Sequence, residues 1–211
     1  MGNTAIFEVT KLQLGRGSAG KQPLGFALSA GQWCKLTGEN GSGKTTLLRV
    51  LCGLSEPLAG RVCWQGSPIT YHRLSYHHSI IYIGHKFGFR GGLSVAENLE
   101  FYCALAGRHG RYNLGQAMEY FKISDLSQRP YAALSHGQQQ RVALCRLILE
   151  KARLWLLDEP TSALDRPGHD SFQDLLVKHI SNGGTAVVAT HKPFEHQALQ
   201  DAHCLRLNDY L

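Results

Sequence analysis

The chain begins with short runs in which apolar and polar residues alternate, a pattern typical of β-strands. Ile6–Val9 and Leu12–Leu14 are predicted to be two short strands separated by turn-compatible residues. The stretch 15–20 that follows is rich in Gly and Ser, as loops are. The pattern predicts an antiparallel sheet at the start of the chain.

A strand, a glycine-rich loop and a helix are predicted next, in that order. Gln32–Thr37 reads as a strand, and Thr45–Leu54 carries Leu47, Leu48 and Leu51 at the spacing of one helical face. Backbone N–H groups in the first turn of a helix have no partner within the helix. A loop that enters a helix in this way therefore favours an anion.

The second half of the chain combines helices with two buried strands. Residues 93–150 are predicted to be mostly helical, with polar breaks at 108–113 and 128–130. Arg153–Leu157 and Thr185–Ala189 are short apolar runs bounded by polar residues, as in strands buried on both faces of a parallel sheet. The chain is therefore predicted to have an α/β fold.

The segment Tyr82–Phe89 is predicted to be the end of a strand that leads into a glycine-punctuated loop. It places His85 just beyond the strand. A histidine in this position could be a metal ligand, an acid or base, or a structural loop residue, and the segment alone leaves these alternatives open.

Composition fits one folded domain and argues against a membrane-spanning chain. The 211 residues are 43% hydrophobic, enough for a sizeable core. The most apolar run, Leu154–Leu157, ends at Asp158 and Glu159, far short of the roughly 18 to 20 apolar residues that cross a bilayer. The N-terminal residues lack the basic start and apolar core of a signal peptide. We therefore expect a cytoplasmic protein.

Charge and cysteine content change this picture little. The formal charge is +6, but the basic residues are spread along the chain and form no run, so a nucleic-acid partner is not expected. The cysteines form no CxxC pair, and we expect reduced thiols that fill the core. They are Cys34, Cys52, Cys63, Cys103, Cys145 and Cys204.

The loop between the predicted strand and helix fits the phosphate-binding pattern G-x-x-x-x-G-K-[ST]. Its residues are Gly38, Glu39, Asn40, Gly41, Ser42, Gly43, Lys44, Thr45 and Thr46. Glycines let successive N–H groups turn toward phosphates, Lys44 reaches the β- and γ-phosphates, and the Thr45 hydroxyl can bind Mg²⁺. A plain glycine-rich turn would not require Lys and Thr at these places. The loop predicts binding of ATP and Mg²⁺.

Two adjacent carboxylates follow the apolar run Leu154–Leu157. Side chains alternate along a strand, so Asp158 and Glu159 are not expected to do the same work. In a phosphate-loop enzyme the first carboxylate holds Mg²⁺ and the second can polarise the attacking water. A strand that merely ends in solvated acids is the alternative for such a pair by itself.

Leu134–Gln138 has the features of a helix start. Ser135 is a suitable N-cap residue, Gly137 permits close approach, and Gln138 begins a polar run before the apolar positions of the helix. On physical grounds alone, the segment could hold an anion.

Together, these segments resemble the ATP-binding subunits of ABC (ATP-binding cassette) transporters over essentially the whole chain. Five segments carry the resemblance, in the family's order. Gly38–Thr46 resembles the Walker A motif, Leu134–Gln138 the LSGGQ signature, Leu154–Glu159 the Walker B strand, Ser162–Asp165 the D-loop, and His191 after Val187–Thr190 the switch histidine.

The resemblance implies one nucleotide-binding domain over residues 1–211. Its core would be a RecA-like P-loop NTPase fold with an antiparallel β subdomain and a helical subdomain at roughly 86–150. It also implies a homodimer that encloses two ATP molecules, in which one protomer's signature residues Ser135, Gly137 and Gln138 contact the ATP of the other. Thr45 and Asp158 would hold Mg²⁺, Glu159 would be the general base, and His191 would sense the γ-phosphate.

Three positions depart from the family's pattern. Arg16 stands where an aromatic residue usually stacks on adenine, and a guanidinium plane can also stack on a base. His136 replaces a glycine of the signature. His85 stands where the family has the Q-loop glutamine, which contacts Mg²⁺ or the attacking water and senses the membrane partner.

One subfamily resembles this combination, the ATP-binding subunits of the cytochrome c biogenesis haem exporter. The resemblance implies a peripheral subunit at the cytoplasmic face of the inner membrane, which works with multi-spanning permease subunits and indirectly with a haem chaperone. ATP hydrolysis would drive haem export or release of the loaded chaperone. The segments that carry it are Ile83–His85, Ala96–Leu99, Phe101–Tyr102, Val62–Gly66 and Leu157–Pro160.

Other interpretations remain beside this one. His85 could be a haem or metal ligand, although its place in the cassette favours a substitute for the Q-loop glutamine, and Tyr71–His78 reads as a solvated surface without ligand spacing. The chain could serve another exported cargo. A soluble ABC ATPase of DNA repair or translation is a further alternative, but such proteins usually carry a coiled-coil insertion or a second cassette.

Overall fold

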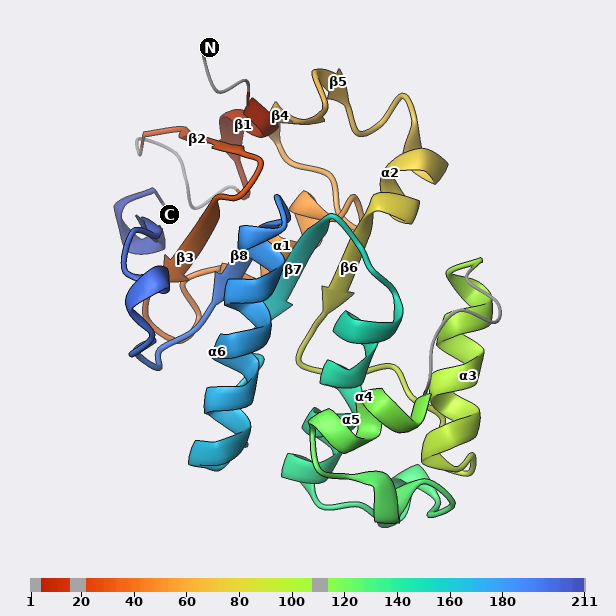
Figure 1. Ribbon diagram of the computed structural model, residues 1–211. Coiled ribbons are helices and arrows are strands. Elements are labelled where there is room, and N and C mark those ends of the chain that lie inside the picture. The colour runs from red at the N-terminus through yellow and green to blue at the C-terminus, as the bar shows by residue number, and fades with distance from the viewer. Residues whose placement is uncertain (1–4, 16–21, 108–113, 211) are drawn as a thin grey trace.

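Two β-sheets organise the chain in the computed structural model, which describes residues 5–15, 22–107 and 114–210 (Figure 1). The antiparallel sheet has the order β2-β1-β4-β5 and consists of β1 (Ala5–Gln13), β2 (Leu24–Ser29), β4 (Ala59–Trp64) and β5 (Ser67–Pro68). The parallel sheet has the order β6-β7-β8-β3-β9 and consists of β3 (Trp33–Thr37), β6 (Ile80–Ile83), β7 (Leu154–Asp158), β8 (Thr185–Ala189) and β9 (His203–Arg206).

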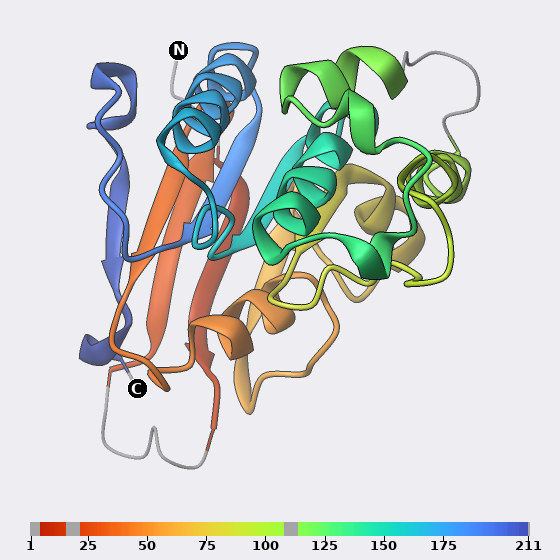
Figure 2. The same cartoon turned by 90° about the horizontal axis from the view of Figure 1, so that it is seen from below.

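Helices connect and cover these sheets. They are α1 (Lys44–Leu51), α2 (Arg73–Ser79), α3 (Val95–Leu105), α4 (Leu114–Tyr120), α5 (His136–Leu149) and α6 (Arg166–Ser181). Short 3-10 turns lie at Ser124–Leu126, Tyr131–Ala133, Gln197–Leu199 and Leu207–Asp209. Helices α3, α4 and α5 gather at one side of the sheets in both ribbon views (Figure 2). An α/β fold with a parallel and an antiparallel sheet is thus confirmed.

The strands of the parallel sheet separate two hydrophobic cores. Trp155 and Leu157 of β7 pack on the side of helices α3 to α6. Leu154 and Leu156 of the same strand pack on the other side, with α1 and the antiparallel sheet. Because side chains alternate along a strand, one uninterrupted apolar run supplies both cores.

The first strand differs from its prediction. Ile6–Val9 and Leu12–Leu14 were expected to be separate strands, but β1 is one strand that continues from the first into the second and ends at Gln13. Lys11 has a φ of 49°, and the pairing with β2 shifts register between Val9 and Leu12. This irregularity interrupts the alternation of side chains without ending the strand, which is why the sequence pattern suggests a break.

The first helix is shorter than predicted. It begins at Lys44, one residue before the predicted start, and ends at Leu51 rather than Leu54. Gly53 turns the chain with a φ of 73°, and Leu54 is 57% exposed. Leu54 is therefore an apolar residue beyond the helix and not part of its buried face.

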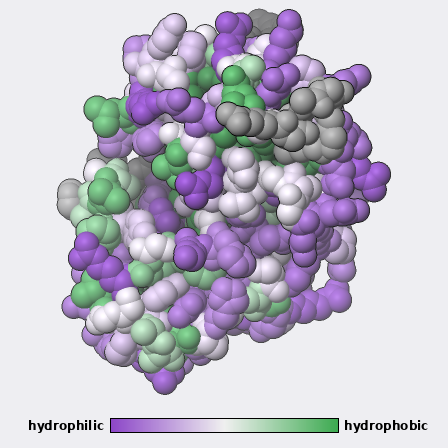
Figure 3. All heavy atoms as spheres, turned by 180° about the vertical axis from the view of Figure 1, so that it is seen from behind, coloured by the Kyte–Doolittle hydropathy of each residue, from purple (hydrophilic) through white to green (hydrophobic). Residues whose placement is uncertain are grey.

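The surface seen from behind is mostly hydrophilic, and its hydrophobic residues form separate small groups (Figure 3). Among residues 5–15, 22–107 and 114–210, no helix combines the length and the apolar character needed to cross a lipid bilayer.

Candidate functional site

The glycine-rich loop lies at the carboxyl edge of the parallel sheet, between β3 and α1. Gly41 and Gly43 have φ values of 82° and 91°, a left-handed conformation that favours glycine. A Cβ on Gly38 would lie 2.6 Å from the Ser42 hydroxyl oxygen, which is buried and has no hydrogen-bond partner among the described residues. The loop is thus wound tightly and holds an unpaired polar group.

Lys44 curls back over this loop. Its Nζ donates hydrogen bonds to the carbonyl oxygens of Gly38 at 2.7 Å and Glu39 at 2.9 Å, and the residue is 8% exposed. A buried ammonium group inside a ring of backbone at the start of a helix creates a positive site for phosphate oxygens.

Thr45 and Asp158 meet from two different elements. The Thr45 hydroxyl donates to the Asp158 carboxylate at 2.6 Å, and Asp158 ends β7 and is 5% exposed. A hydroxyl and a carboxylate side by side are hard oxygen ligands of the kind that Mg²⁺ prefers. This donor set fits the expected Mg²⁺, and the residues are those that the sequence predicted for it.

Glu159 leaves the strand in a left-handed conformation, with a φ of 49°. Its N–H donates to the Ala189 carbonyl at 2.9 Å, and its own carbonyl accepts from Gln140 Nε2 at 2.8 Å. Its Oε1 atom is buried and has no hydrogen bond with a described residue, while His191 Nε2 lies 3.6 Å away. The backbone of Glu159 is therefore fixed, whereas its Oε1 atom accepts no hydrogen bond from a described residue.

His191 shares a cleft with the glycine-rich loop. It follows β8 and its side chain is half exposed. The cleft has a volume of about 660 Å³. It is lined by residues of the glycine-rich loop and the end of β3, by His191, and by residues at and after β9: Thr37, Gly38, Glu39, His191, Arg206, Asn208 and Asp209. The structure therefore brings His191, Glu159 and the loop together, as the sequence predicted.

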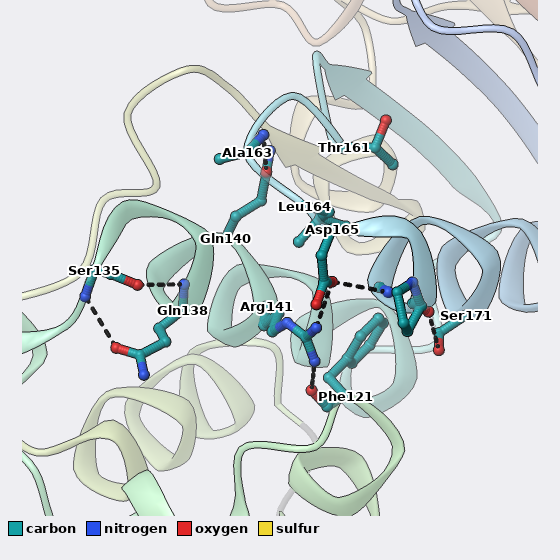
Figure 4. A network of polar contacts seen from close by, with 12 residues as sticks. Phe121, Ser135, Gln138, Gln140, Arg141, Thr161, Ala163, Leu164, Asp165 and Ser171 are labelled. Atoms are coloured by element: carbon teal, nitrogen blue, oxygen red, sulfur yellow. Dashed lines mark hydrogen bonds and ion pairs between the residues drawn. The ribbon is translucent and has the colours of Figure 1, made fainter.

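Ser135 and Gln138 form a reciprocal helix cap at the start of α5 (Figure 4). The Gln138 N–H donates to the Ser135 hydroxyl at 3.3 Å, and the Ser135 N–H donates to the Gln138 side-chain oxygen at 3.0 Å. A Cβ on Gly137 would lie 2.8 Å from the Ala163 carbonyl, so this glycine allows α5 to pack on the loop before α6. No hydrogen bond joins these three residues to loop 38–46 within the described part of the chain.

Gln140 is a site residue that the sequence reading placed only within a helix. It is 2% exposed, and its amide contacts three groups after β7, the carbonyl of Glu159, the hydroxyl of Ser162 at 3.3 Å and the N–H of Ala163 at 2.8 Å. It thereby ties α5 to the backbone of Glu159. Figure 4 shows its contact with Ala163. A buried amide on the apolar face of a predicted helix is the signal that could have identified it.

Arg141 connects the same helix to the start of α6. It donates to the Asp165 carboxylate at 2.6 Å and to the Phe121 carbonyl at 2.6 Å (Figure 4). Desolvation acts to raise the pKa of Asp165, but hydrogen bonds from the Gly168 N–H and from Arg141 lower it below its usual range. Asp165 therefore stays charged as the N-cap of α6.

Two further residues outside the sequence prediction hold the site. Lys192 Nζ donates to the Thr161 carbonyl at 2.6 Å and the Leu164 carbonyl at 3.3 Å, which fixes the loop after Glu159. Asn208 Oδ1 accepts the Glu39 N–H at 3.1 Å. Lys192 and Asn208 both lie far along the chain from the residues they contact. Local sequence patterns therefore could not predict these hydrogen bonds.

His85 is exposed in the loop after β6, as expected. A Cβ on the preceding Gly84 would lie 2.6 Å from the Tyr82 hydroxyl, so the ring of Tyr82 requires glycine there. Burial raises the pKa of Tyr82 to about 12, and the charge of Asp158 adds to this effect. Phe87 stacks on His136 of the signature, with ring centroids 5.8 Å apart. The loop of His85 therefore contacts the start of α5.

Two other predictions stand apart from the site. Arg16, expected to stack on adenine, lies outside the described residues. His72 is the N-cap residue of α2, and His77 and His78 lie within that helix. Within the described ranges, no group of three or more His, Cys, Asp or Glu side chains could hold a metal ion.

Comparisons with known proteins identify the family of this chain. The family model described as ABC transporter matches residues 22–162. The cytochrome c biogenesis ATP-binding export protein CcmA of Escherichia coli strain K12 is 44% identical over 173 residues, which are 81% of each chain.

Two solved structures share the fold. An ABC transporter ATP-binding protein from Pyrococcus furiosus has a TM-score of 0.81 and 23% identity, and the match covers 97% of this chain and 98% of that one. The cbiO1 protein from Clostridium perfringens, part of the ABC transporter complex cbiONQ, has a TM-score of 0.68 and 26% identity over 89% and 79% of the chains. The chain therefore belongs to the ABC transporter family of ATP-binding proteins, and within it to the cytochrome c biogenesis ATP-binding export proteins.

Proposed function

We propose that this chain hydrolyses ATP to drive haem export, or release of a haem-loaded chaperone, in cytochrome c biogenesis. The observation that carries the hydrolytic part is the junction of α1 and β7, where Thr45 meets Asp158 at 2.6 Å beside the buried Lys44. The 44% identity to a cytochrome c biogenesis export protein supports the biological setting. Residues 1–211 would act as one nucleotide-binding domain with a helical subdomain at roughly 86–150.

The loop 38–46 would bind the phosphates of ATP. The hydrogen bonds of Lys44 to two loop carbonyls support this role, because they hold its ammonium group at the loop where the phosphates would bind. Thr45 and Asp158 would hold Mg²⁺, which neutralises charge on the β- and γ-phosphates. Arg16 would stack on the adenine.

Glu159 would act as the general base. Its carboxylate oxygen is free of hydrogen bonds from the described residues, and its backbone is held on both sides by Ala189 and Gln140. A carboxylate carried on a backbone held in this way can take a proton from the attacking water. His191, 3.6 Å from that oxygen, would donate a hydrogen bond to the γ-phosphate.

Ser135, Gly137 and Gln138 would contact ATP bound by a second copy of the chain. Their position supports this role, because Ser135 is exposed at the amino end of α5 and no hydrogen bond connects it to its own loop 38–46 in the described ranges. The functional unit would be a homodimer with two nucleotides at the interface.

His85 would link the nucleotide to the membrane partners. It is exposed beside the site, and its loop contacts the signature through Phe87 and His136. Imidazole can bind a water molecule or a metal, so it could perform part of the work of a glutamine amide. The protein would lie at the cytoplasmic face of the inner membrane, bound to multi-spanning permease subunits.

A complementation experiment tests this proposal. The chain is expressed in a bacterium that lacks its own cytochrome c biogenesis ATP-binding export protein, and covalently bound haem in c-type cytochromes is measured. The wild-type chain should restore haem attachment, Glu159→Gln should not, and the matched surface variant Glu119→Gln should. Restoration by Glu159→Gln, or no restoration by a wild-type chain that assembles with the membrane subunits, would contradict the proposal.

A further inference from the structure

A second large cavity lies at the opposite edge of the parallel sheet. Its volume is about 710 Å³, within the range of roughly 300 to 1,000 Å³ that is usual for small-molecule sites. The cavity is lined by residues at the amino ends of three strands. Arg153 and Gly184 directly precede β7 and β8, and Ala30 lies shortly before β3. The cleft with the glycine-rich loop is at the carboxyl ends of the same strands.

The walls of this cavity are mainly apolar. Leu147 and Ile148 come from the end of α5, Leu175 from α6 and Tyr120 from α4. Tyr120 is 38% exposed, and its hydroxyl donates to the Ser171 carbonyl at 2.9 Å, which holds the ring in place. Apolar walls of this kind favour a ligand with an apolar body over an inorganic ion.

Two stacked rings form the most rigid part of the lining. Trp155 and His179 have ring centroids 3.8 Å apart and an angle of 10° between their planes. His179 Nε2 lies 3.1 Å from the Thr185 carbonyl, and a carbonyl only accepts, so Nε2 carries the proton. A Cβ on Gly184 would lie 2.2 Å from the His179 ring, so the backbone reserves this space for the ring.

The charge around the cavity is positive. Lys151, Arg153 and Lys178 line it, and no Asp or Glu is among its described lining residues. Within the described chain, Arg153 and Lys178 form no ion pair. The carboxyl ends of α5 and α6 contribute about half a negative charge each, and the two positive charges of Arg153 and Lys178 exceed their sum.

The indole of Trp155 carries a buried hydrogen-bond donor. Trp155 is 2% exposed, and its indole Nε1 is buried without a hydrogen bond to a described residue. An indole nitrogen can only donate, and this one has no acceptor among the described residues.

We propose that this cavity binds an amphipathic anion, a molecule with an apolar body and one anionic head group such as a carboxylate. The body lies against Leu147, Ile148 and the Trp155–His179 pair, and the head lies near Arg153 and Lys178. The site is separate from the nucleotide cleft, and the proposal is independent of the function proposed above.

Binding of a fluorescent probe tests the proposal on the full chain. Anilinonaphthalene sulfonate combines an apolar body with one anionic group, and its emission rises in an apolar site. We expect saturable binding in excess ATP, and displacement by dodecanoate but not by dodecylamine. Lys178→Glu should weaken probe binding about five- to tenfold, which corresponds to about 1 to 1.4 kcal/mol. Lys11→Glu makes the same charge change on β1 and should leave the affinity as it is.

A second variant keeps the test independent of charge. Ile148→Trp, on the cavity wall, should reduce the number of bound probe molecules while circular dichroism and the melting temperature show a folded protein. Displacement of the probe by ATP would place it in the nucleotide cleft and overturn the proposal. Equal affinity of Lys178→Glu and the wild-type chain, or equal competition by dodecylamine, would overturn it as well.

Discussion

The two edges of the parallel sheet use the same strands in opposite ways. At the carboxyl edge, β7 ends in Asp158, next to the amino end of α1, and Glu159 Oε1 accepts no hydrogen bond from a described residue. At the amino edge, Trp155 of the same strand is stacked on His179, near the carboxyl ends of α5 and α6. Backbone N–H groups at the start of a helix, together with Lys44, supply positive charge at the first edge, whereas Arg153 and Lys178, near the ends of two helices, supply it at the second.

The comparison indicates that residues important for activity and residues important for stability lie at opposite edges of the sheet. The carboxyl edge keeps charged groups in defined positions that a closely packed core would not tolerate, since unpaired buried polar groups are costly. The amino edge is held by ring stacking and close contact. Substitutions at the first edge should therefore reduce activity, and those at the second should reduce stability.

The largest effect is expected from Glu159→Gln. Removing a general base lowers hydrolysis by about 100- to 10,000-fold, while the amide keeps the shape of the side chain and leaves ATP binding in place. Phosphate release and nucleotide affinity, measured on the assembled complex, check this. Glu119→Gln, on the surface of α4, should behave as the wild type. Full turnover by Glu159→Gln would remove the assignment of the base.

Lys44→Ala should lose both binding and hydrolysis. A charge-assisted hydrogen bond contributes about 1.5 to 3 kcal/mol, so ATP affinity should fall about 10- to 100-fold. Calorimetric titration with a non-hydrolysable ATP analogue measures the affinity, and Lys11→Ala on β1 is the matched control. If Lys44→Ala bound the analogue as tightly as the control does, the phosphate-binding role of the loop would be wrong.

Gly184→Ala should act on stability at the other edge. Its Cβ would lie 2.2 Å from the His179 ring, and the forced shift should lower the free energy of unfolding by about 2 to 3 kcal/mol. Gly92→Ala is a suitable comparison, because its Cβ would meet no heavy atom within 4 Å. Urea unfolding of the two variants measures the difference. Equal stability would show that the ring has room to move.

The pH dependence of stability should depend on His179. Burial lowers its pKa from 6.5 to about 4, although hydrogen bonds from the ring to the backbone of Thr185 and Arg153 act in the opposite direction. The unfolded chain therefore binds a proton between these values that the folded chain does not, and stability is lost as pH falls. Between pH 7.5 and pH 5 this loss is about 2 kcal/mol.

A comparison with His179→Phe isolates this effect. The phenyl ring keeps a stacked partner for Trp155 but does not titrate, so its stability should fall by about 2 kcal/mol less over the same pH interval. His169, whose pKa burial also lowers, is present in both proteins and cancels. Identical pH dependence in the two proteins would show that His179 is not the titrating group.

The smallest effect is expected from His85→Gln. One exposed hydrogen-bonding group contributes about 0.5 to 1.5 kcal/mol, so hydrolysis stimulated by the membrane partners should change about two- to tenfold. His203→Gln, exposed on β9, is the control. If hydrolysis and its stimulation by the partners were both the same as in the wild type, His85 would have no role in coupling.

Local patterns predicted much of the fold and of the candidate site. The run Thr185–Ala189 is β8 to the residue, because a strand buried on both faces needs a continuous apolar run. The loop 38–46 was identified because phosphate binding needs glycine, lysine and threonine at fixed spacing. The limits of β1 and α1 were wrong, because the irregularity at Lys11 and the turn at Gly53 interrupt patterns in ways that apolar spacing does not record.

The supporting residues of the site could not be predicted in the same way. Gln140, Lys192 and Asn208 reach their partners across 19 to 169 residues of chain, and no local spacing encodes such contacts. The same holds for the cavity at the amino edge, whose walls come from separate helices and from the loops before three strands.

The sequence by itself determined which candidate groups this protein carries: a loop with the phosphate-binding pattern, two carboxylates at the end of a buried strand, and His85 at the position where the resemblance expects a Q-loop glutamine. Only the tertiary structure decided how these groups are used. It set Thr45 against Asp158, turned Glu159 out of the strand, and left Trp155 and His179 stacked beside a basic cavity. The physical reason is that residue types and spacing specify which interactions are possible, whereas the packing of the sheet and helices decides which partners meet.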